Sequence, residues 1–357
     1  MPLNRRVIGA GLLGLAASSV TSPAVAGTAA RSSSASLVRV FAATDRHVVQ
    51  PLIDDFERRH PGLRVDYVDA GSLALYEQSV RQREDAPERP DVLFSSAMDL
   101  QIKLVNDGYA QRHESPHAHQ LPKWAVWKHE AYGITQEPVG IAVNRRLLAA
   151  TEVPRTRAAL AALLLSDIPH WRGRAATYDI ARAGLGFLIA TQDAMATPKS
   201  WDVVRALGRC DASLHEDTQS MLERVAAGDA LLAYNVLGSY AEAFARKRSE
   251  IAVSYFDDYT LVVSRVAFIA RTAPNPPGAR LWLDYMLSAP GQQLLAASGG
   301  LYGIRADSAR PHSAAALESR LGRALRPIAL GPGLLAHLDR SRREAFLKRW
   351  NQAVRPS

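Results

Sequence analysis

Cysteine is almost missing from this sequence of 357 residues, because Cys210 is the only one. A single thiol excludes an intramolecular disulfide and a zinc site built from paired cysteines. No cysteine follows the apolar segment from Val7 to Ala17 to carry a lipid. That segment is far shorter than the roughly 20 apolar residues that cross a bilayer, and no later segment supplies such a run. We therefore expect a soluble mature protein without a lipid anchor.

Familiar catalytic motifs are missing as well. The sequence holds no Gly-x-Ser-x-Gly elbow, no Walker loop and no His-Glu-x-x-His helix. The pair Gly184-x-Gly186 lacks the third glycine and the later acidic residue of a dinucleotide fingerprint. These absences argue against an enzyme and predict no cofactor. A secreted hydrolase whose Ser, His and Asp come from distant segments stays an alternative, since triads are defined by geometry.

Positive charge exceeds negative charge, with a formal net charge of +8. Loss of Arg5 and Arg6 with an export signal would lower this charge to +6. Lysine and arginine are scattered, and no basic run is interleaved with aromatic residues, so nucleic acid is not a predicted partner. The positive field favours a small anionic solute.

The first 26 residues have the pattern of an export signal. Arg5 and Arg6 precede the apolar core, and Ala24-Val25-Ala26 offers a small-residue cleavage site. We expect residues 1–26 to be removed on the way to the periplasm; the twin arginine leaves ordinary and twin-arginine export both open. Residues 27–36, rich in Ala, Ser, Thr and Arg, predict a flexible leader.

Strand and helix patterns alternate along the next part of the chain. Residues 37–43, 63–68 and 91–94 have strand patterns, and each is followed by a helical pattern. This order predicts a parallel sheet in an α/β fold. About 330 residues remain after cleavage, more than one core usually holds, so two lobes are expected. We assign residues 37–143 and 259–357, the latter mostly helical, to the first lobe and 144–258 to the second.

Polar residues follow two of these strands. Thr44 and Asp45 come after the first strand, and Ser95 and Ser96 come after the third. Because ligands of open α/β sheets bind beyond the carboxyl ends of the strands, these residues are expected at one site. Ser96 and Asp99 have capping-box spacing, so Ser96 is expected to cap the next helix. Ser95 and the free helix amides would then face an anionic or hydroxylated ligand.

A histidine-rich loop holds His113, His117 and His119, with His129 farther on. Their spacing matches no recognised ligand set, and we predict no metal site there.

Four segments of the sequence resemble the type II extracellular solute-binding proteins of bacterial ABC transporters. The segments are Pro51 to Phe56, Asp91 to Gln101, Ala233 to Tyr240 and Asp258 to Val262. The resemblance is to family 1 of these proteins, in the branch of ferric-iron-binding and phosphoglycerate-transport regulatory proteins. It implies two α/β lobes joined by two crossing strands, which close on a solute and deliver it to an inner-membrane permease.

The resemblance also implies which residues bind the solute. The implied ligand-binding residues are Thr44, Asp45, Ser95 and Ser96 from the first lobe and Asp179, Gly184, Tyr234 and Asn235 from the second. Each also has a purely structural interpretation: helix cap, turn or core.

Iron-binding members of this family use adjacent tyrosines, but Asn235 follows Tyr234 here. We therefore expect an organophosphate or a carboxylate rather than ferric ion, bound by a monomer. A periplasmic sensory protein that signals to a membrane histidine kinase stays open as an alternative, as does a ferric-ion-binding protein.

Overall fold

The computed structural model describes residues 36–82, 86, 88–298, 300–305, 307 and 313–355. The expected export signal, residues 1–26, lies outside the described residues, and so does the expected leader except for Ser36, which already begins the first strand. In the described part of the chain, no helix is both long and apolar enough to cross a membrane.

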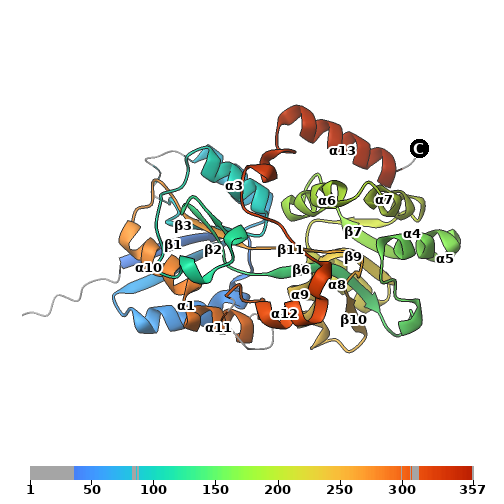
Figure 1. Ribbon diagram of the computed structural model, residues 1–357, viewed down its shortest axis with the longest axis horizontal. Coiled ribbons are helices and arrows are strands. Elements are labelled where there is room, and N and C mark those ends of the chain that lie inside the picture. Colours follow the sequence, from blue (N-terminus) through green and yellow to red (C-terminus); the bar gives the residue numbers. More distant parts are fainter. Residues whose placement is uncertain are drawn as a thin grey trace, which may run out of the picture. The chain divides into compact units, whose positions relative to one another are not determined.

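Two mixed sheets organise the described chain (Figure 1). In the first, β2, β1 and β3 run parallel, whereas β12, β5 and β4 add antiparallel pairings. The parallel part was predicted from the sequence. The strands in spatial order are β2 (Leu63–Asp69), β1 (Ser36–Ala42), β3 (Val92–Ser95), β12 (Val266–Ile269), β5 (Ala131–Gly133) and β4 (Val126–Trp127).

The second sheet contains seven of the described strands. Its central strand, β6, pairs antiparallel with β11, β9 and β10, while β7 pairs parallel with β9 and β8. The strands are β13 (Leu325–Pro327), β11 (Thr260–Val263), β6 (Glu137–Asn144), β9 (Leu232–Leu237), β7 (Ala175–Tyr178) and β8 (Ser213–His215), with β10 (Ile251–Ser254) beside β6. Two sheets, each with its helices, give the two-lobe α/β fold.

Helices cover both sheets. Those packed with the first sheet are α1 (Arg46–Arg59), α2 (Ser72–Arg81), α3 (Met98–Asn106), α10 (Pro276–Leu287) and α11 (Ala289–Ser298). Those packed with the second are α4 (Arg157–Ser166), α5 (Ile168–Trp171), α6 (Gly184–Ala196), α7 (Ser200–Arg209), α8 (Thr218–Ala227) and α9 (Gly238–Ala245). The chain continues with α12 (Ala314–Leu321) and α13 (Arg340–Val354). Short 3₁₀ turns are η1 (Ala118–Gln120), η2 (Lys123–Ala125), η3 (Ala150–Glu152), η4 (Gly322–Ala324) and η5 (Pro332–Leu335).

The chain crosses between the sheets at places that differ from the sequence prediction. The first crossing is residues 134–136, between β5 and β6, rather than the predicted border at 143 and 144. The second is residues 264 and 265, between β11 and β12, rather than the border at 258 and 259. Every residue of β6 is buried. The apolar residues 138–143 within β6 indicate a strand covered on both faces, but not which sheet holds it.

The last helix also departs from its predicted place. Helices α10 and α11 cover the first lobe as expected, but α13 packs on α7 of the second lobe. The ring centroids of Phe346 and Trp201 are 5.3 Å apart, and those of Trp350 and Trp201 are 6.4 Å apart. An amphipathic pattern identifies the buried face of a helix without identifying the surface that it covers.

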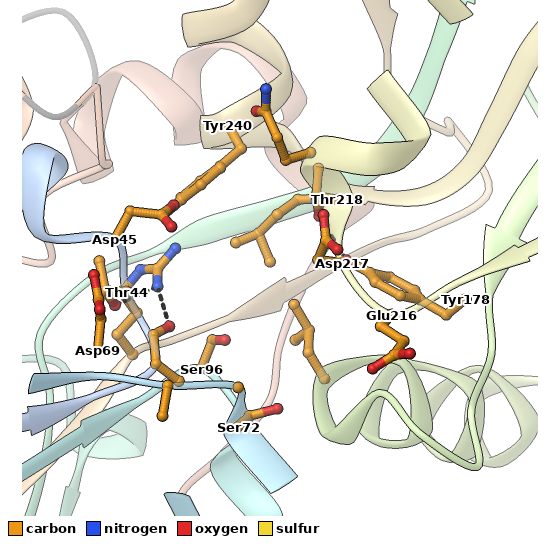
Figure 2. Close-up of a pocket in the computed structure, with 17 residues that line it drawn as sticks. Thr44, Asp45, Asp69, Ser72, Ser96, Tyr178, Glu216, Asp217, Thr218 and Tyr240 are labelled. Carbon is orange, nitrogen blue, oxygen red and sulfur yellow. Dashed lines mark hydrogen bonds between the residues drawn. The ribbon is translucent and has the colours of Figure 1, made fainter. Parts of the chain in front are cut away.

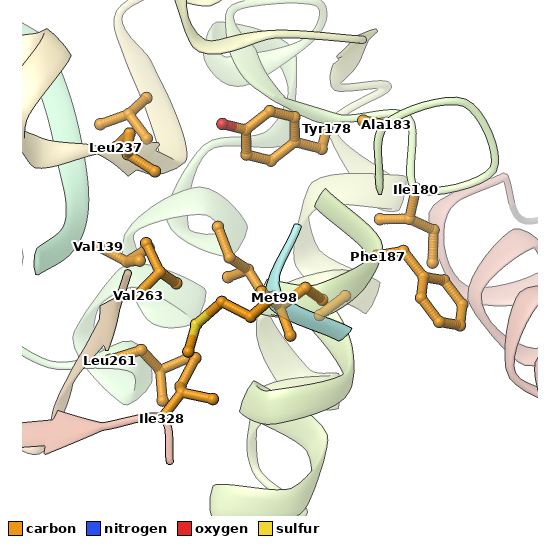
Figure 3. Close-up of a cluster of buried hydrophobic side chains, with 14 of the residues drawn as sticks. Met98, Val139, Tyr178, Ile180, Ala183, Phe187, Leu237, Leu261, Val263 and Ile328 are labelled. Atoms are coloured by element: carbon orange, nitrogen blue, oxygen red, sulfur yellow. The ribbon is translucent and has the colours of Figure 1, made fainter. Parts of the chain in front are cut away.

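A hydrophobic cluster lies beside the crossings (Figure 3). Met98 of the first lobe is fully buried among side chains of the second lobe and of the C-terminal segment. Other members of this cluster labelled in Figure 3 are Val139, Phe187, Leu261, Val263 and Ile328. The Met98 sulfur also accepts a hydrogen bond from the backbone N–H of Ser264, at 3.3 Å. This cluster joins the two lobes at the base of the cleft between them.

Candidate functional site

A cavity of about 410 Å³ opens between the two lobes (Figure 2). One wall comes from the first lobe, at the carboxyl ends of β1, β2 and β3, and the other comes from the second lobe. The lining residues are Ala43, Thr44, Asp45, Asp69, Ala70, Gly71, Ser72, Ser96, Tyr178, Leu185, Glu216, Asp217, Thr218, Gln219, Leu237, Tyr240 and Arg265. The structure thus brings three predicted site residues, Thr44, Asp45 and Ser96, to one cavity.

Several helices begin at the cavity wall. The residues that precede or open α1, α2, α8 and α9 all line it. At α2, the N-cap residue is Gly71, and no described side chain accepts a hydrogen bond from the amides of its first turn in the manner of a cap. Free amides at the positive end of a helix dipole stabilise a negative group. The start of α2 is therefore the best-prepared place for an anion on the first-lobe wall.

Arg265 lies in the second crossing and is only 2% exposed. Its Nε is 2.9 Å from the Glu137 carboxylate, and its Nη1 donates to the Thr44 hydroxyl at 2.5 Å, the contact drawn in Figure 2. Burial disfavours the charged guanidinium, but the adjacent Glu137 carboxylate outweighs this effect and raises the pKa of Arg265. A permanent positive charge therefore lies at the floor of the cavity.

Glu137 connects the same ion pair to the second lobe. It accepts hydrogen bonds from the hydroxyls of Thr135, at 2.7 Å, and of Ser239, near the start of α9. The Arg265 guanidinium donates a hydrogen bond to Thr44, which lies in the first lobe just before α1. The pair therefore links both crossings and both lobes through fully buried groups.

Four carboxylates surround the rest of the cavity: Asp45, Asp69, Glu216 and Asp217. Asp69 accepts a hydrogen bond from the Arg46 N–H at 3.1 Å, and Asp217 accepts one from the Ser220 N–H at 2.8 Å. Both carboxylates thus bind backbone amides in the first turn of a helix. Glu216 pairs with Arg182 at 2.5 Å. Together with Arg265, the described lining has a formal charge of −3. A bare inorganic anion suits such a wall poorly, whereas carboxylates accept hydrogen bonds readily from hydroxyl or amino groups.

Asp45 also makes a contact across the cleft. Its Oδ2 accepts from the Tyr240 hydroxyl of α9 at 2.9 Å, and Figure 2 shows the two side chains pointing toward each other. Burial raises the pKa of Tyr240 to about 12, so the hydroxyl keeps its proton and donates. This hydrogen bond joins the first-lobe wall to the second-lobe wall.

The roles of the two serines are the reverse of the sequence prediction. Ser95 is buried away from the cavity, and its Oγ accepts from the Ala97 N–H at 3.2 Å. Ser96 lines the cavity and does not cap α3, whose N-cap residue is Ala97. The cause is a helix that begins one residue later than a cap at Ser96 requires, which leaves Asp99 to accept from the Leu100 N–H at 2.9 Å.

Of the second-lobe candidates, Asp179 and Gly184 lie outside the cavity lining. Asp179 follows β7, where its carboxylate accepts from the Ala181 N–H at 3.1 Å and stabilises a turn. Gly184 begins α6, where it contacts the first lobe and lines a second cavity between the lobes.

Tyr234 and Asn235 are also absent from the cavity lining. The Tyr234 hydroxyl and the Asn235 amide each donate to Asp193 at 2.9 Å, inside the second lobe. The physical reason is a bulge: Asn235 has φ of +65°, and the register of β6 against β9 shifts here. The strand therefore continues to Leu237, and Leu237 and Tyr240 reach the cavity in their place.

Sequence reasoning missed Arg265, Tyr240 and the residues at the start of α8. Asp217 is the N-cap residue of α8, so Thr218 and Gln219 open the helix at the cavity. Tyr240 stood within a segment that carries the family resemblance. Arg265 has no local signal, because its position depends on where the chain crosses between the sheets.

The described residues form no set of metal ligands. Among the described residues, no group of three or more His, Cys, Asp or Glu side chains is placed to hold a metal ion. His113 is 2.9 Å from Asp284, and His129 is 3.1 Å from the Tyr132 hydroxyl, both within the first lobe.

Comparison with known proteins adds independent information. Residues 38–300 match the family described as bacterial extracellular solute-binding protein. The fold is similar to that of a substrate-binding protein of an ABC transporter from Agrobacterium tumefaciens, with 33% identity, a TM-score of 0.85 and coverage of 93% of this chain and 97% of that one. The comparison with curated proteins gives no significant match.

Two more distant structures share the fold. AfuA from Actinobacillus pleuropneumoniae, solved with fructose 6-phosphate, has 15% identity and a TM-score of 0.74, with 90% of this chain and 99% of that one covered. Iron-bound HitA from Pseudomonas aeruginosa has 17% identity and a TM-score of 0.70, with 89% and 99% covered. Similar folds thus hold chemically different solutes, and the fold alone does not select between them.

Proposed function

The chain belongs to the bacterial extracellular solute-binding protein family, and from that premise we propose that it binds a small hydroxylated organic anion between its lobes. It then delivers this solute to the inner-membrane permease of an ABC importer. A phosphorylated sugar, a phosphoglycerate or a hydroxycarboxylate has the required chemistry. The proposal rests on one observation above all: the cavity combines a buried guanidinium with a ring of carboxylates.

The two parts of this lining suit two parts of one solute. Arg265 and the uncapped start of α2 suit a phosphate or carboxylate group. The carboxylates of Asp45, Asp69 and Asp217 suit hydroxyl groups, which donate the hydrogen bonds that these oxygens accept. A solute with only one of these features leaves the other part of the wall unpaired, and buried unpaired polar groups are costly.

Ferric ion fits this lining less well. Hard cations of that kind take several anionic oxygen ligands at one point. The Tyr234 phenol is bonded to Asp193 inside the second lobe, and the cavity carboxylates are bonded to separate partners. The organic anion therefore remains the better candidate.

A thermal-shift screen tests the proposal. The panel contains hexose phosphates, phosphoglycerates, hydroxylated di- and tricarboxylates, inorganic phosphate and ferric ion. A solute at 100 times its dissociation constant stabilises the folded protein by about 2.7 kcal/mol. Recovery of the solute unchanged after incubation separates binding from catalysis. A melting temperature that rises only with ferric ion overturns the proposal.

Matched variants at Ser72 locate the solute. In Ser72→Asp, a carboxylate at the first position of α2 repels an anion while it favours the helix itself, by roughly 0.3–1 kcal/mol. Ser72→Asn has a similar shape without the charge. We expect the melting shift to vanish in the first variant and to persist, though weakened, in the second. Equal shifts in both variants would place the anion elsewhere.

A further inference from the structure

We propose that Gly184 sets how far the two lobes close on the solute, because a side chain at this position would meet the opposite lobe. This inference rests on the proposed function, since it concerns closure around a bound solute. Gly184 is thus a positioning residue of the binding cycle and not a ligand contact.

The geometry at Gly184 is a contact between lobes. Gly184 is buried and is the first residue of α6 in the second lobe. A Cβ atom added to it would lie 2.8 Å from the Ser72 Oγ and 3.0 Å from a methyl group of Leu100, both in the first lobe. The third neighbour, the Cβ of Ala97 at 3.4 Å, also belongs to the first lobe. All three of these atoms therefore lie across the cleft.

The backbone gives no other reason for glycine here. Gly184 is not among the glycines with positive φ, and it occupies the first turn of a helix, where other residues are comfortable. Gly186 provides the contrast, since its added Cβ would lie 2.5 Å from the Cβ of Tyr178 in the same lobe. A side chain at 186 therefore disturbs the second lobe itself, whereas the three atoms nearest to a Cβ at 184 all belong to the first lobe.

The contact is also narrow. On one side lies the solute cavity, lined by Ser72 and Leu185, and on the other lies a second cavity of about 480 Å³, lined by Leu73, Leu100 and Gly184. The contact therefore lies between two cavities, each lined by residues of both lobes.

A larger side chain at 184 should disfavour the closed arrangement in proportion to its size. The Ser72 hydroxyl and the Leu100 methyl are side-chain ends that can rotate, so the Gly184→Ala variant should lose only about 2- to 5-fold in affinity. Gly184→Leu requires much larger displacements, and we expect a loss of at least about 30-fold. The apo protein should keep its melting temperature, because the new side chain faces solvent when the lobes separate.

The experiment combines titration calorimetry with the solute from the screen and melting of the apo variants. Gly62→Ala and Gly62→Leu serve as controls, because an added Cβ at Gly62 has no described neighbour within 4 Å and φ is not positive there. Adding Leu100→Ala to Gly184→Ala should restore part of the lost solute affinity, because it removes the methyl group that a Cβ at 184 would meet. An affinity loss matched by a fall in apo melting temperature would overturn the inference and make Gly184 an ordinary packing residue.

A distance measurement separates this inference from the proposed function. Spin labels at Gln78→Cys and Glu223→Cys, both exposed and in different lobes, report the separation of the lobes by pulsed electron resonance, while the single native Cys210 is buried. We expect the apo protein to show a short-distance population that Gly184→Leu lacks. Identical distributions overturn the role of Gly184. If no solute in the screen binds, the proposed function is wrong, but the distance comparison still tests the role of Gly184.

Discussion

The buried ion pair between Arg265 and Glu137 gives the sharpest stability prediction. Glu137→Gln keeps the shape of the side chain and removes its charge, so the guanidinium stays buried without a counter-charge. Glu137 is 0% exposed and Arg265 is 2% exposed, so water cannot replace the lost partner. Hydrogen bonds from the hydroxyls of Thr135 and Ser239 to the carboxylate are weakened as well.

Removing one partner of a buried pair costs about 3–5 kcal/mol. Each kcal/mol lowers the melting temperature of a large domain by roughly 2 °C or more, so the apo variant should melt about 6–10 °C lower. An anionic solute at Arg265 would supply the missing negative charge. We therefore expect the solute to raise the melting temperature of Glu137→Gln by more than it raises that of the wild type.

Differential scanning calorimetry with and without solute provides both numbers. Glu344→Gln is the matched control, because Glu344 pairs with Arg340 at the surface, where ion pairs contribute little. A Glu137→Gln variant that melts within about 1 °C of this control would refute the argument about the buried charge. An equal solute effect in the variant and the wild type would remove Arg265 from the anion site.

Other predictions concern single groups. Burial raises the pKa of Asp99 to about 7, against about 3.9 in an unfolded chain. The protonated carboxyl therefore stabilises the folded protein at low pH. This stabilisation is lost as the pH rises through 7. The melting temperature of the wild type should accordingly fall relative to Asp99→Asn between pH 5 and 8, and parallel pH profiles would contradict this. Tyr240→Phe removes the hydrogen bond to Asp45 across the cleft, which contributes about 0.5–1.5 kcal/mol. By titration calorimetry the variant should bind the solute roughly 2- to 13-fold more weakly, and the melting temperature of the apo protein should not change. Trp350→Ala should lower the free energy of unfolding in urea by about 3–5 kcal/mol, because the ring is buried against Trp201. A decrease of less than about 1 kcal/mol would show that the protein does not need α13 for its stability.

The sequence predicts the parallel half of the first sheet because its signals are local. Alternating strand and helix patterns from residue 37 onward indicate β1, β2 and β3, and Thr44 follows its strand as expected. Such patterns depend on the periods of 2 and 3.6 residues, which tertiary contacts rarely override in long elements. The first-lobe wall of the cavity follows from that order.

The second-lobe wall was harder to predict because it depends on non-local geometry. A single bulge at Asn235 shifts the register of β9 against β6, and Tyr234 is buried while Leu237 and Tyr240 line the cavity. A shift of one residue reverses the face on which every later side chain lies. Arg265 reaches the cavity only because the chain changes sheets beside it, and no period in the sequence encodes that event.

Titration calorimetry with three related compounds tests the central claim most directly. The compounds are the hydroxylated anion with the largest thermal shift, the same compound without its anionic group, and the inorganic or simple anion alone. The proposed site pairs the anion with Arg265 and α2 and pairs the hydroxyls with the carboxylates, so only the complete compound should bind tightly. Each fragment should lose at least about 10-fold, since hydrogen bonds to charged groups contribute about 1.5–3 kcal/mol. Tight binding of the simple anion alone, or of the uncharged compound alone, would contradict the account.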